Sequence, residues 1–174
     1  MLKENLIKLN LNDIELIDAL PEQEELYRNL VNLQFHDLSE YRDNFDILED
    51  GRFEWGFEAC FDEKNQQHHP LLIMFEEKVV GFLIFSKYNP NPSKIDFMLV
   101  EMFILRMYRN RGIGKKAIQM IFDNFKGKYH LDVAANNEPA MKFWVSLIDK
   151  YSTSLTKKPF VEEGCSYINF IFEV

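Results

Sequence analysis

Apolar positions in the first half of the chain follow two periods, that of a strand and that of a helix. Residues 5–12 set leucines among polar neighbours and predict a first strand. Pro21 and the acidic residues after it open a predicted helix, because proline and acids suit a helix N-terminus. Residues 36–68 mix aromatic and acidic side chains and predict no clear element. The apolar runs Leu71–Glu76 and Val79–Ser86, separated by two charged residues, predict an antiparallel hairpin. In the helix predicted after Pro21, one apolar face carries Leu26, Leu30 and Leu33.

The second half gives clearer elements. Residues 89–92, Asn-Pro-Asn-Pro, predict a turn. A long strand over Ile95–Arg106, a helix over Gly114–Phe125 and a short strand over Tyr129–Ala134 follow. A further helix has Pro139 in its first turn. Its apolar stripe is Ala140, Phe143, Trp144, Leu147, Ile148 and Tyr151, and the last strand alternates Ile168, Phe170, Phe172 and Val174 with the residues between them.

The predicted order is strand, helix, three strands, helix, strand, helix, strand. Hairpins and strand-helix-strand units occur together, which predicts an α/β (α+β mixed) fold with a central mixed sheet flanked by helices. The length of 174 residues fits one domain spanning residues 1–174.

No stretch reaches the ~18–20 uninterrupted apolar residues that cross a bilayer, and the N-terminus lacks the apolar region of a signal peptide. We therefore expect a cytoplasmic protein without a membrane partner. Cys60 and Cys165 lie far apart and outside any CxxC pair, which favours buried thiols over a disulfide or a nucleophile. The histidines show no zinc-binding spacing, so no metal is expected.

The formal net charge of −8 argues against nucleic acid as a partner, since nucleic-acid binding needs a basic surface. Residues 36–63 hold ten acidic side chains against two arginines, whereas residues 102–122 hold basic side chains and no acid. The first segment suits a cation and the second an anion, although a solvated surface is the favoured explanation of each charge run taken alone. The acids are Asp37, Glu40, Asp43, Asp46, Glu49, Asp50, Glu54, Glu58, Asp62 and Glu63, and the bases of the second segment are Arg106, Arg109, Arg111, Lys115 and Lys116.

A glycine-containing loop joins the strand that ends near Leu105 to the next helix. Gly112 and Gly114 are two of only seven glycines in the chain. A helix N-terminus presents unpaired N–H groups and a partial positive charge, and glycine lets a phosphate approach the backbone. Arg111 and Lys115 add side-chain charge. The loop predicts a phosphate or pyrophosphate site, and the alternative is a tight turn on a basic surface.

Two other phosphate-binding loops fit this segment less well. The Rossmann fingerprint places its third glycine where Ala117 stands, although alanine can occupy that position. A Walker loop requires Gly-Lys-Ser/Thr, which does not follow Gly114. A nucleotide-dependent transferase is therefore an alternative that rests on the glycine pair alone.

Two short patterns occur in an order and at a separation that are typical of one family. They are Arg109-x-x-Gly112-x-Gly114 and Asn137-x-x-Ala140-x-x-Phe143-Trp144. These patterns resemble the two signatures of the GNAT N-acetyltransferases, Arg/Gln-x-x-Gly-x-Gly/Ala and Asn-x-x-Ala-x-x-Phe/Leu-Tyr. The resemblance is strong over residues 79–151 and looser over 36–70. Residues 36–62 and the Phe143-Trp144 pair are also similar to a little-characterised bacterial group of predicted GNAT acetyltransferases.

The resemblance implies that the chain binds acetyl-CoA as a cosubstrate. In such proteins the signature loop grips the CoA pyrophosphate, and the strand before it offers backbone groups to the pantetheine arm. Asn137 then hydrogen-bonds the pantetheine arm, or caps the helix that follows it, or does both. The predicted cofactor-binding residues are Phe103, Ile104, Leu105, Arg109, Asn110, Arg111, Gly112, Ile113, Gly114, Lys115, Asn137, Ala140, Phe143 and Trp144.

Glu101 is the candidate general base, since direct acetyl transfer needs a neutral amine. A carboxylate in an otherwise apolar strand is costly unless it is paired or functional. The alternatives are that Glu101 points outward or pairs with an arginine, or that a base acts through water with help from the acids of residues 36–63.

The position of the general acid departs from the family pattern. Trp144 stands where many relatives have tyrosine, and an indole supplies no proton near neutral pH. Tyr151 is the candidate acid in its place, and the alternative is that no acid is needed, because a thiol with a pKa of ~8.5 leaves as a tolerable thiolate. Trp144 itself is expected to pack against the core or the cofactor.

Two classes of function follow from the resemblance. The first is an N-acetyltransferase that acts on a primary amine of a small molecule or peptide, which is cationic if the acidic segment lines the acceptor site. The second is a GNAT-fold module that binds acyl-CoA as a sensor or partner domain without turnover. GNAT relatives are often dimers, so the resemblance also allows a homodimer, although no interface is evident in the sequence.

Overall fold

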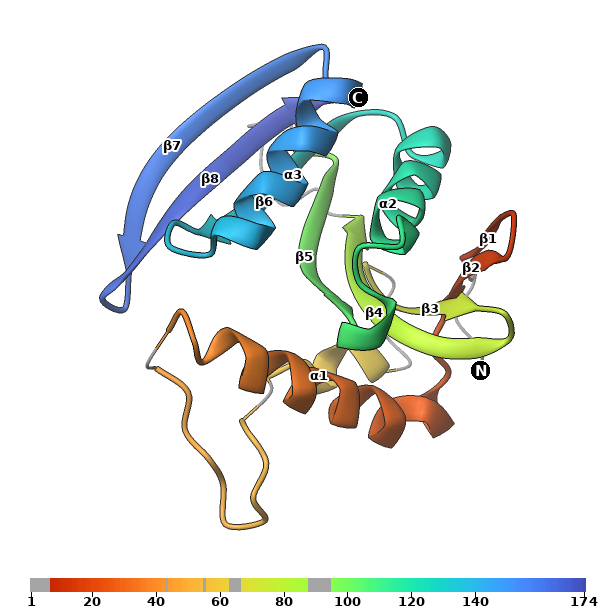
Figure 1. Ribbon diagram of the computed structural model, residues 1–174, viewed down its shortest axis with the longest axis vertical. Helices are drawn as coiled ribbons and strands as arrows, with labels where there is room; N and C mark the ends of the chain where they lie inside the picture. Colours follow the sequence, from red (N-terminus) through yellow and green to blue (C-terminus); the bar gives the residue numbers. More distant parts are fainter. Residues whose placement is uncertain (1–6, 43, 55, 63–66, 88–94) are drawn as a thin grey trace.

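The computed structural model describes residues 7–42, 44–54, 56–62, 67–87 and 95–174. Eight strands form one sheet in the order β1-β2-β3-β4-β5-β6-β8-β7 (Figure 1). Neighbouring strands are antiparallel except β5 and β6, which are parallel. The strands are β1 (Lys8–Leu11), β2 (Ile14–Asp18), β3 (His68–Phe75), β4 (Lys78–Lys87), β5 (Phe97–Ile104), β6 (Lys128–Ala134), β7 (Ser154–Glu162) and β8 (Cys165–Glu173).

Helices cover the sheet on both faces. Helix α1 (Glu24–Leu38) packs on one face, where Tyr27 and Val31 join the core residues of β3, β4 and β5. Helices α2 (Ile113–Asn124) and α3 (Glu138–Tyr151) pack on the other face and bury a second, larger core (Figure 1). Three short 3₁₀ turns complete the described structure: η1 (Pro21–Gln23), η2 (Glu58–Phe61) and η3 (Arg106–Tyr108).

This architecture confirms the predicted mixed α/β class with a central mixed sheet flanked by helices. The predicted hairpin over residues 71–86 is also present as β3 and β4, with each strand slightly longer than expected. The turn predicted at residues 89–92 lies outside the described residues.

Two strands are missing from the predicted order, one at each end of the chain. The N-terminal segment forms a hairpin rather than one strand, because Asn12 adopts a left-handed conformation with φ of 56° and reverses the chain. Strand β7 was not predicted, because it is an exposed edge strand and buries no apolar face that would give a periodic pattern. Its Lys157-Lys158-Pro159 sequence is typical of a protected sheet edge.

The centre of the sheet opens where β5 and β6 diverge. Their register joins only Phe97 to Tyr129 and Met98 to His130, although both strands continue for several residues. On its other side, β5 pairs with β4, and this pairing shifts by one residue near Val100. The shift is a β-bulge in β5. A bulge increases local twist, so it turns the end of β5 away from β6. The C-terminal end of β5 therefore has one free backbone edge inside the fold.

No helix in the described part of the chain is long and apolar enough to cross a membrane. Among the same residues, no three His, Cys, Asp or Glu side chains gather as a set of metal ligands would.

Candidate functional site

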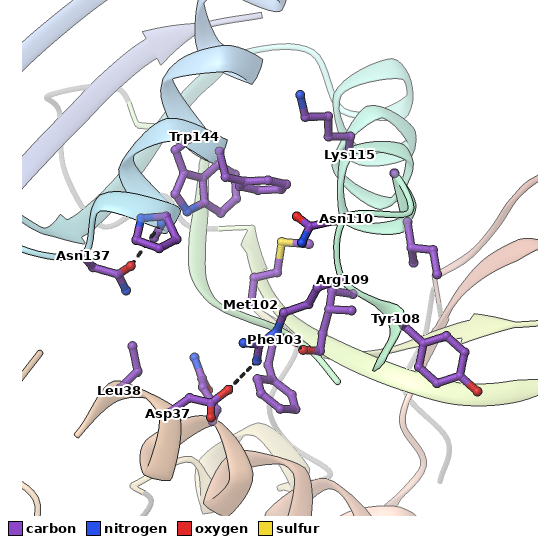
Figure 2. A pocket seen from close by; sticks show the side chains of 18 of the residues that line it. Asp37, Leu38, Met102, Phe103, Tyr108, Arg109, Asn110, Lys115, Asn137 and Trp144 are labelled. Atoms are coloured by element: carbon purple, nitrogen blue, oxygen red, sulfur yellow. Dashed lines mark hydrogen bonds and ion pairs between the residues drawn. The ribbon is translucent and has the colours of Figure 1, made fainter. Parts of the chain in front are cut away.

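A cavity of about 660 Å³ lies where β5 ends and the next two helices begin (Figure 2). The end of α1 closes its lower side, and the start of α3 forms the side opposite the loop after β5 (Figure 2). The residues that border it are Gln34, Asp37, Leu38, Tyr41, Met102, Phe103, Ile104, Tyr108, Arg109, Asn110, Gly112, Ile113, Gly114, Lys115, Asn137, Pro139, Ala140, Phe143 and Trp144.

One part of the cavity wall is apolar. Met102 of β5 points into the open space, and Trp144 of α3 faces it from the other side (Figure 2). The Phe143 ring packs edge-on against Trp144, with ring centroids 5.0 Å apart. This wall suits the alkyl part of a ligand, and Trp144 packs here as the sequence suggested.

The opposite part of the wall is the loop that enters α2. Gly112 has a φ of 80°, a left-handed conformation that favours glycine, and directly precedes the first helical residue. The first turn of α2 therefore presents backbone N–H groups without intrahelical partners beside the cavity. Lys115 also borders the cavity and adds a positive charge. The left-handed glycine, the N–H groups at the start of α2 and Lys115 thus lie together on one wall.

Arg111 differs from Lys115, although both were predicted to add charge to this site. The Arg111 guanidinium lies 5.2 Å from the Phe75 ring centroid and 5.6 Å from that of Tyr108. Arg111 is therefore held against Phe75 and Tyr108 and does not itself border the cavity.

Arg109, the first residue of the signature, is tied to the protein itself. Its Nε donates to the Ile104 carbonyl at 2.7 Å, and its Nη2 donates to the Asp37 carboxylate (Figure 2). Arg106 donates to the same carboxylate, with its Nη2 2.6 Å from Asp37 Oδ1. Partial burial by itself raises the pKa of Asp37, but the hydrogen bonds from Arg106 and Arg109 outweigh it and hold the pKa below its usual value. We call these three side chains the arginine clamp, since they fasten the loop to α1.

Replacing Asp37 by asparagine should loosen the loop, because the variant loses the charge that holds both arginines. We expect acetyl-CoA to bind several-fold more weakly and the free energy of unfolding to fall by about 1 kcal/mol or less, since both arginines are partly exposed. The stabilisation by Asp37 is present above the usual carboxyl pKa of about 3.9 and is lost as the pH falls through its lower value in the folded protein. Calorimetric titration and denaturant unfolding measure both effects.

Asp46→Asn is the matched control for that variant, because Asp46 is an exposed acid outside the cavity wall. It changes the net charge by the same amount and should leave both quantities near those of the wild type. Equal acetyl-CoA affinity in the two variants would contradict a role for the clamp.

Asn137 performs one of its two predicted tasks within the fold. Its side-chain oxygen accepts a hydrogen bond from the Ala140 N–H at 3.1 Å and caps α3. The residue also borders the cavity, so its amide nitrogen is available to a ligand there. Next to it, Asn136 donates to the Tyr41 carbonyl at 2.8 Å and links α3 to the segment after α1.

Glu101 points toward α1 and meets Gln34. Gln34 Nε2 donates to Glu101 Oε2 at 2.5 Å, and of these two residues Gln34 borders the cavity. Burial raises the pKa of the Glu101 carboxyl, while the Arg42 guanidinium and the Gln34 hydrogen bond reduce the rise. A carboxyl of this kind is typical of functional sites as well as of buried polar networks.

The predicted acid, Tyr151, lies at the last residue of α3. Its ring packs edge-on against Phe122, with centroids 5.7 Å apart, and Lys150 Nζ lies 4.8 Å from its ring centroid. The cavity is bordered by the first two turns of α3 instead, because α3 runs away from it. The structure therefore does not bring Tyr151 to the predicted cofactor residues.

Four cavity residues come from α1 and the turn after it, and the sequence analysis named one of them, Asp37, only as a member of the acidic segment. They are Gln34, Asp37, Leu38 and Tyr41. Their spacing of i, i+3, i+4 and i+7 indicates one helical face, which was the single local signal available. Nothing in that spacing tells which part of the fold the face meets.

Comparison with known protein families identifies the family of the chain that forms this site. Residues 28–147 match the model of the acetyltransferase (GNAT) family. The chain belongs to the GNAT acetyltransferase family. The match includes the clamp, the loop into α2 and most of α3. No curated protein matches the chain.

Solved structures show the same fold at low sequence identity. An acetyltransferase from Thermus thermophilus is 14% identical, with a TM-score of 0.66 over 97% of this chain and 100% of that one. The ribosomal-protein-S5-alanine acetyltransferase from Vibrio fischeri is 12% identical, with a TM-score of 0.64 over 97% and 96%. The microcin C7 self-immunity acetyltransferase MccE, solved in complex with acetyl-CoA and AMP, is 18% identical, with a TM-score of 0.59 over 94% and 93%.

Proposed function

We propose that the chain acts as a single N-acetyltransferase domain that moves an acetyl group from acetyl-CoA to a primary amine. The observation that carries the proposal is the cavity itself, in which a helix N-terminus with a left-handed glycine faces an apolar wall across the open end of β5. GNAT acetyltransferases act on amine acceptors, and a similar fold has been solved with acetyl-CoA.

The cavity residues suit the successive chemical parts of acetyl-CoA. The N–H groups at the start of α2 and the Lys115 ammonium suit its pyrophosphate. The free edge of β5 and the apolar side chains of Met102 and Trp144 suit the pantetheine arm. Bound there, acetyl-CoA supplies a thioester as the acetyl donor. Arg109 takes part through the arginine clamp, which holds the loop in its binding conformation.

Glu101 is the proposed general base. Gln34 borders the cavity and lies between it and the Glu101 carboxylate. The amine proton therefore reaches Glu101 through a bridging water. The raised pKa of Glu101 makes the carboxylate a better proton acceptor than an ordinary one.

The proposed acceptor is cationic before it loses its proton, and Glu101 rather than the acidic segment attracts it. Of the acids in residues 36–63, Asp37 borders the cavity, and its charge is taken up by two arginines. Asp50 lies within ion-pair distance of Arg52 instead. No acid is assigned, because a thiolate leaves without one.

The proposal places this activity in the cytoplasm. In the described part of the chain neither Cys60 nor Cys165 forms a disulfide, which suits a reducing compartment.

Titration with acetyl-CoA, CoA and ATP, followed by a thiol-release screen of amines, tests the proposal. We expect acetyl-CoA and CoA to stabilise the protein and ATP to have no comparable effect, and we expect at least one amine to release thiol. Binding of ATP without binding of CoA would contradict acetyl-CoA as the cosubstrate. Binding of CoA with no active amine would favour an acyl-CoA sensor without turnover over an N-acetyltransferase.

A further inference from the structure

The side-chain amide of Gln34 links the cavity to the proposed base. Gln34 lies on α1 and borders the cavity, whereas Glu101 lies on β5 behind it. Gln34 Nε2 donates to Glu101 Oε2 at 2.5 Å, a contact between residues 67 positions apart in the chain. Gln34 is 4% exposed, so the fold encloses its side chain rather than leaving it in solvent. This hydrogen bond is therefore part of the packed fold at the cavity wall.

The orientation of the Gln34 amide suits an ionised carboxyl. A carboxylate accepts hydrogen bonds and donates none, so the donor end of the amide, Nε2, faces Glu101. The acceptor end, Gln34 Oε1, is buried without a hydrogen-bond partner in the described part of the chain. An unpaired buried acceptor is destabilising, so the amide serves the carboxylate at the expense of its own oxygen. A protonated Glu101 would instead donate to Oε1, so the observed pairing favours the ionised form.

Other ionisable side chains near Glu101 are bound elsewhere. Burial raises the pKa of Glu101 and the Arg42 guanidinium reduces that rise, but Arg42 Nη1 donates to the Tyr167 hydroxyl of β8 at 3.2 Å. The Tyr27 hydroxyl donates to a backbone carbonyl of β4 at 3.1 Å. Among the described residues, the bond from Gln34 is thus the one side-chain hydrogen bond that Glu101 accepts.

We propose that Gln34 is a positioning residue, which holds the Glu101 carboxylate in its ionised form and in a fixed orientation behind the cavity wall. This inference rests on the proposed function, because it gives Gln34 a role through the proposed base. Gln34 exchanges no proton itself. Glu101 Oε2 accepts the hydrogen bond from Gln34, so the other oxygen, Oε1, takes the amine proton that arrives through the bridging water. The amine nitrogen forms the bond to the acetyl carbon, and the sulfur leaves as a thiolate.

A purely structural role for Gln34 makes different predictions. If the bond only fastens α1 to β5, its removal lowers stability and disturbs the whole cavity, whether or not position 101 can ionise. If Gln34 acts through Glu101, its removal changes the protonation of that carboxyl and leaves acetyl-CoA binding intact. The pH dependence of the rate and the interdependence of two substitutions separate these roles.

Gln34→Met removes the donor and keeps a flexible, unbranched side chain. Without the hydrogen bond the ionised carboxyl is less stable, so the rising limb of the pH–rate profile should move to higher pH. At a pH on the wild-type limb we expect kcat to fall about tenfold, the effect of a hydrogen bond to a charged group, and to recover as the pH is raised. The Kd for acetyl-CoA should stay within about twofold of the wild type. A limb that keeps its position would contradict the inference.

Two further variants accompany Gln34→Met. Gln119→Met makes the same substitution at a half-buried glutamine of α2 that does not border the cavity, and its profile should match the wild type. Gln34→Glu keeps the size of the side chain but places a second carboxyl beside Glu101. Two carboxyls in contact do not both ionise readily, so this limb should also move to higher pH. Gln34→Glu keeps the inference testable if Gln34→Met does not fold, and a limb at the wild-type position would contradict it.

Combined substitutions show whether Gln34 acts through Glu101. In the Glu101→Gln background the proposed base is absent, so adding Gln34→Met should change kcat by no more than about twofold. The same step in the wild type should lower kcat about tenfold. An equal loss in both backgrounds would assign Gln34 a structural role and overturn the inference.

A titration of the carboxyl itself separates this inference from the proposed function. Carbon-13 NMR follows the glutamate carboxyls of the folded protein, and the signal missing from Glu101→Gln identifies Glu101. Its titration midpoint should lie at higher pH in Gln34→Met than in the wild type, and at the wild-type value in Gln119→Met. If the midpoint moves but no amine is acetylated, the proposed function fails and the pairing of Gln34 with Glu101 stands. Equal midpoints in Gln34→Met and the wild type overturn the inference even in an active enzyme.

Discussion

Alanine at position 81 is expected to lower the free energy of unfolding by about 3 kcal/mol or more. A Cβ added to Gly81 would lie 2.1 Å from the Phe103 carbonyl oxygen and 3.1 Å from Ile104 Cα. Both are backbone atoms of β5, and Gly81 is paired with Ile104 across the ladder. The clash can be relieved only by moving the two strands apart, which breaks their hydrogen bonds.

Gly114→Ala is the matched control for this effect on stability. Its Cβ would lie 2.9 Å from Met102 Cε, the far end of a flexible side chain that can turn aside. Alanine is also the better helix former by about 1 kcal/mol, so Gly114→Ala should unfold near the wild-type midpoint or above it. Denaturant unfolding followed by circular dichroism measures both variants. A Gly81→Ala protein as stable as Gly114→Ala would show that β4 and β5 do not approach as described.

The effect of Gly81→Ala should extend to the cavity. Gly81 holds the end of β5, and the Leu105 N–H donates to the Val80 carbonyl at 2.9 Å just before the loop begins. A displaced strand end would move Phe103 and the arginine clamp with it. Any folded fraction of Gly81→Ala is therefore expected to bind acetyl-CoA more weakly.

The largest expected effect on catalysis is that of Glu101→Gln. Removing a general base costs about 10²- to 10⁴-fold in rate, so kcat should fall by that amount. The amide introduced by this substitution can still form a hydrogen bond with Gln34, and neither position belongs to the predicted cofactor loop. The Kd for acetyl-CoA should therefore stay within about twofold of the wild type. A change in Kd as large as the change in kcat would assign Glu101 to binding or folding instead.

The pH dependence provides an independent check on Glu101. Because burial raises its pKa, the wild-type rate should increase with pH through a value above the usual carboxyl pKa of about 4.3. That limb should disappear in Glu101→Gln. Between the usual pKa and the raised one, the folded protein holds a proton that the unfolded chain has lost, so the carboxyl's contribution to stability decreases as the pH rises. An unchanged pH profile in the variant would exclude Glu101 as the base.

Local sequence signals determined the loop into α2 and the start of α3. The glycines at 112 and 114 predicted a tight entry into a helix, and Gly112 adopts the left-handed conformation that such an entry uses. Asn137 predicted the start of α3, and its side chain caps that helix. These signals are readable because a loop, a cap and the first turn of a helix depend on residues that are neighbours along the chain.

The same local reasoning failed for Tyr151 and for strand β7. Tyr151 is seven positions beyond Trp144 in the same predicted stripe, yet two helical turns carry it about 10 Å along the axis. Strand β7 was missed because both its faces are exposed and its sequence shows no alternation. A pattern of apolar residues predicts an element and its buried face but gives no position for that face in the fold.

The sequence by itself determined the α/β class, the GNAT resemblance and the glycine loop into α2, because each depends on residues close together in the chain. Tertiary structure alone decided which residues of α1 border the cavity. Gln34 meets Glu101, and Asp37 meets Arg106 and Arg109, across more than fifty residues of chain. They meet because α1 packs across the open end of β5, which follows from the burial of two separate cores on opposite faces of the sheet. Such burial is a property of the whole fold, and the short patterns that identify a family do not encode it.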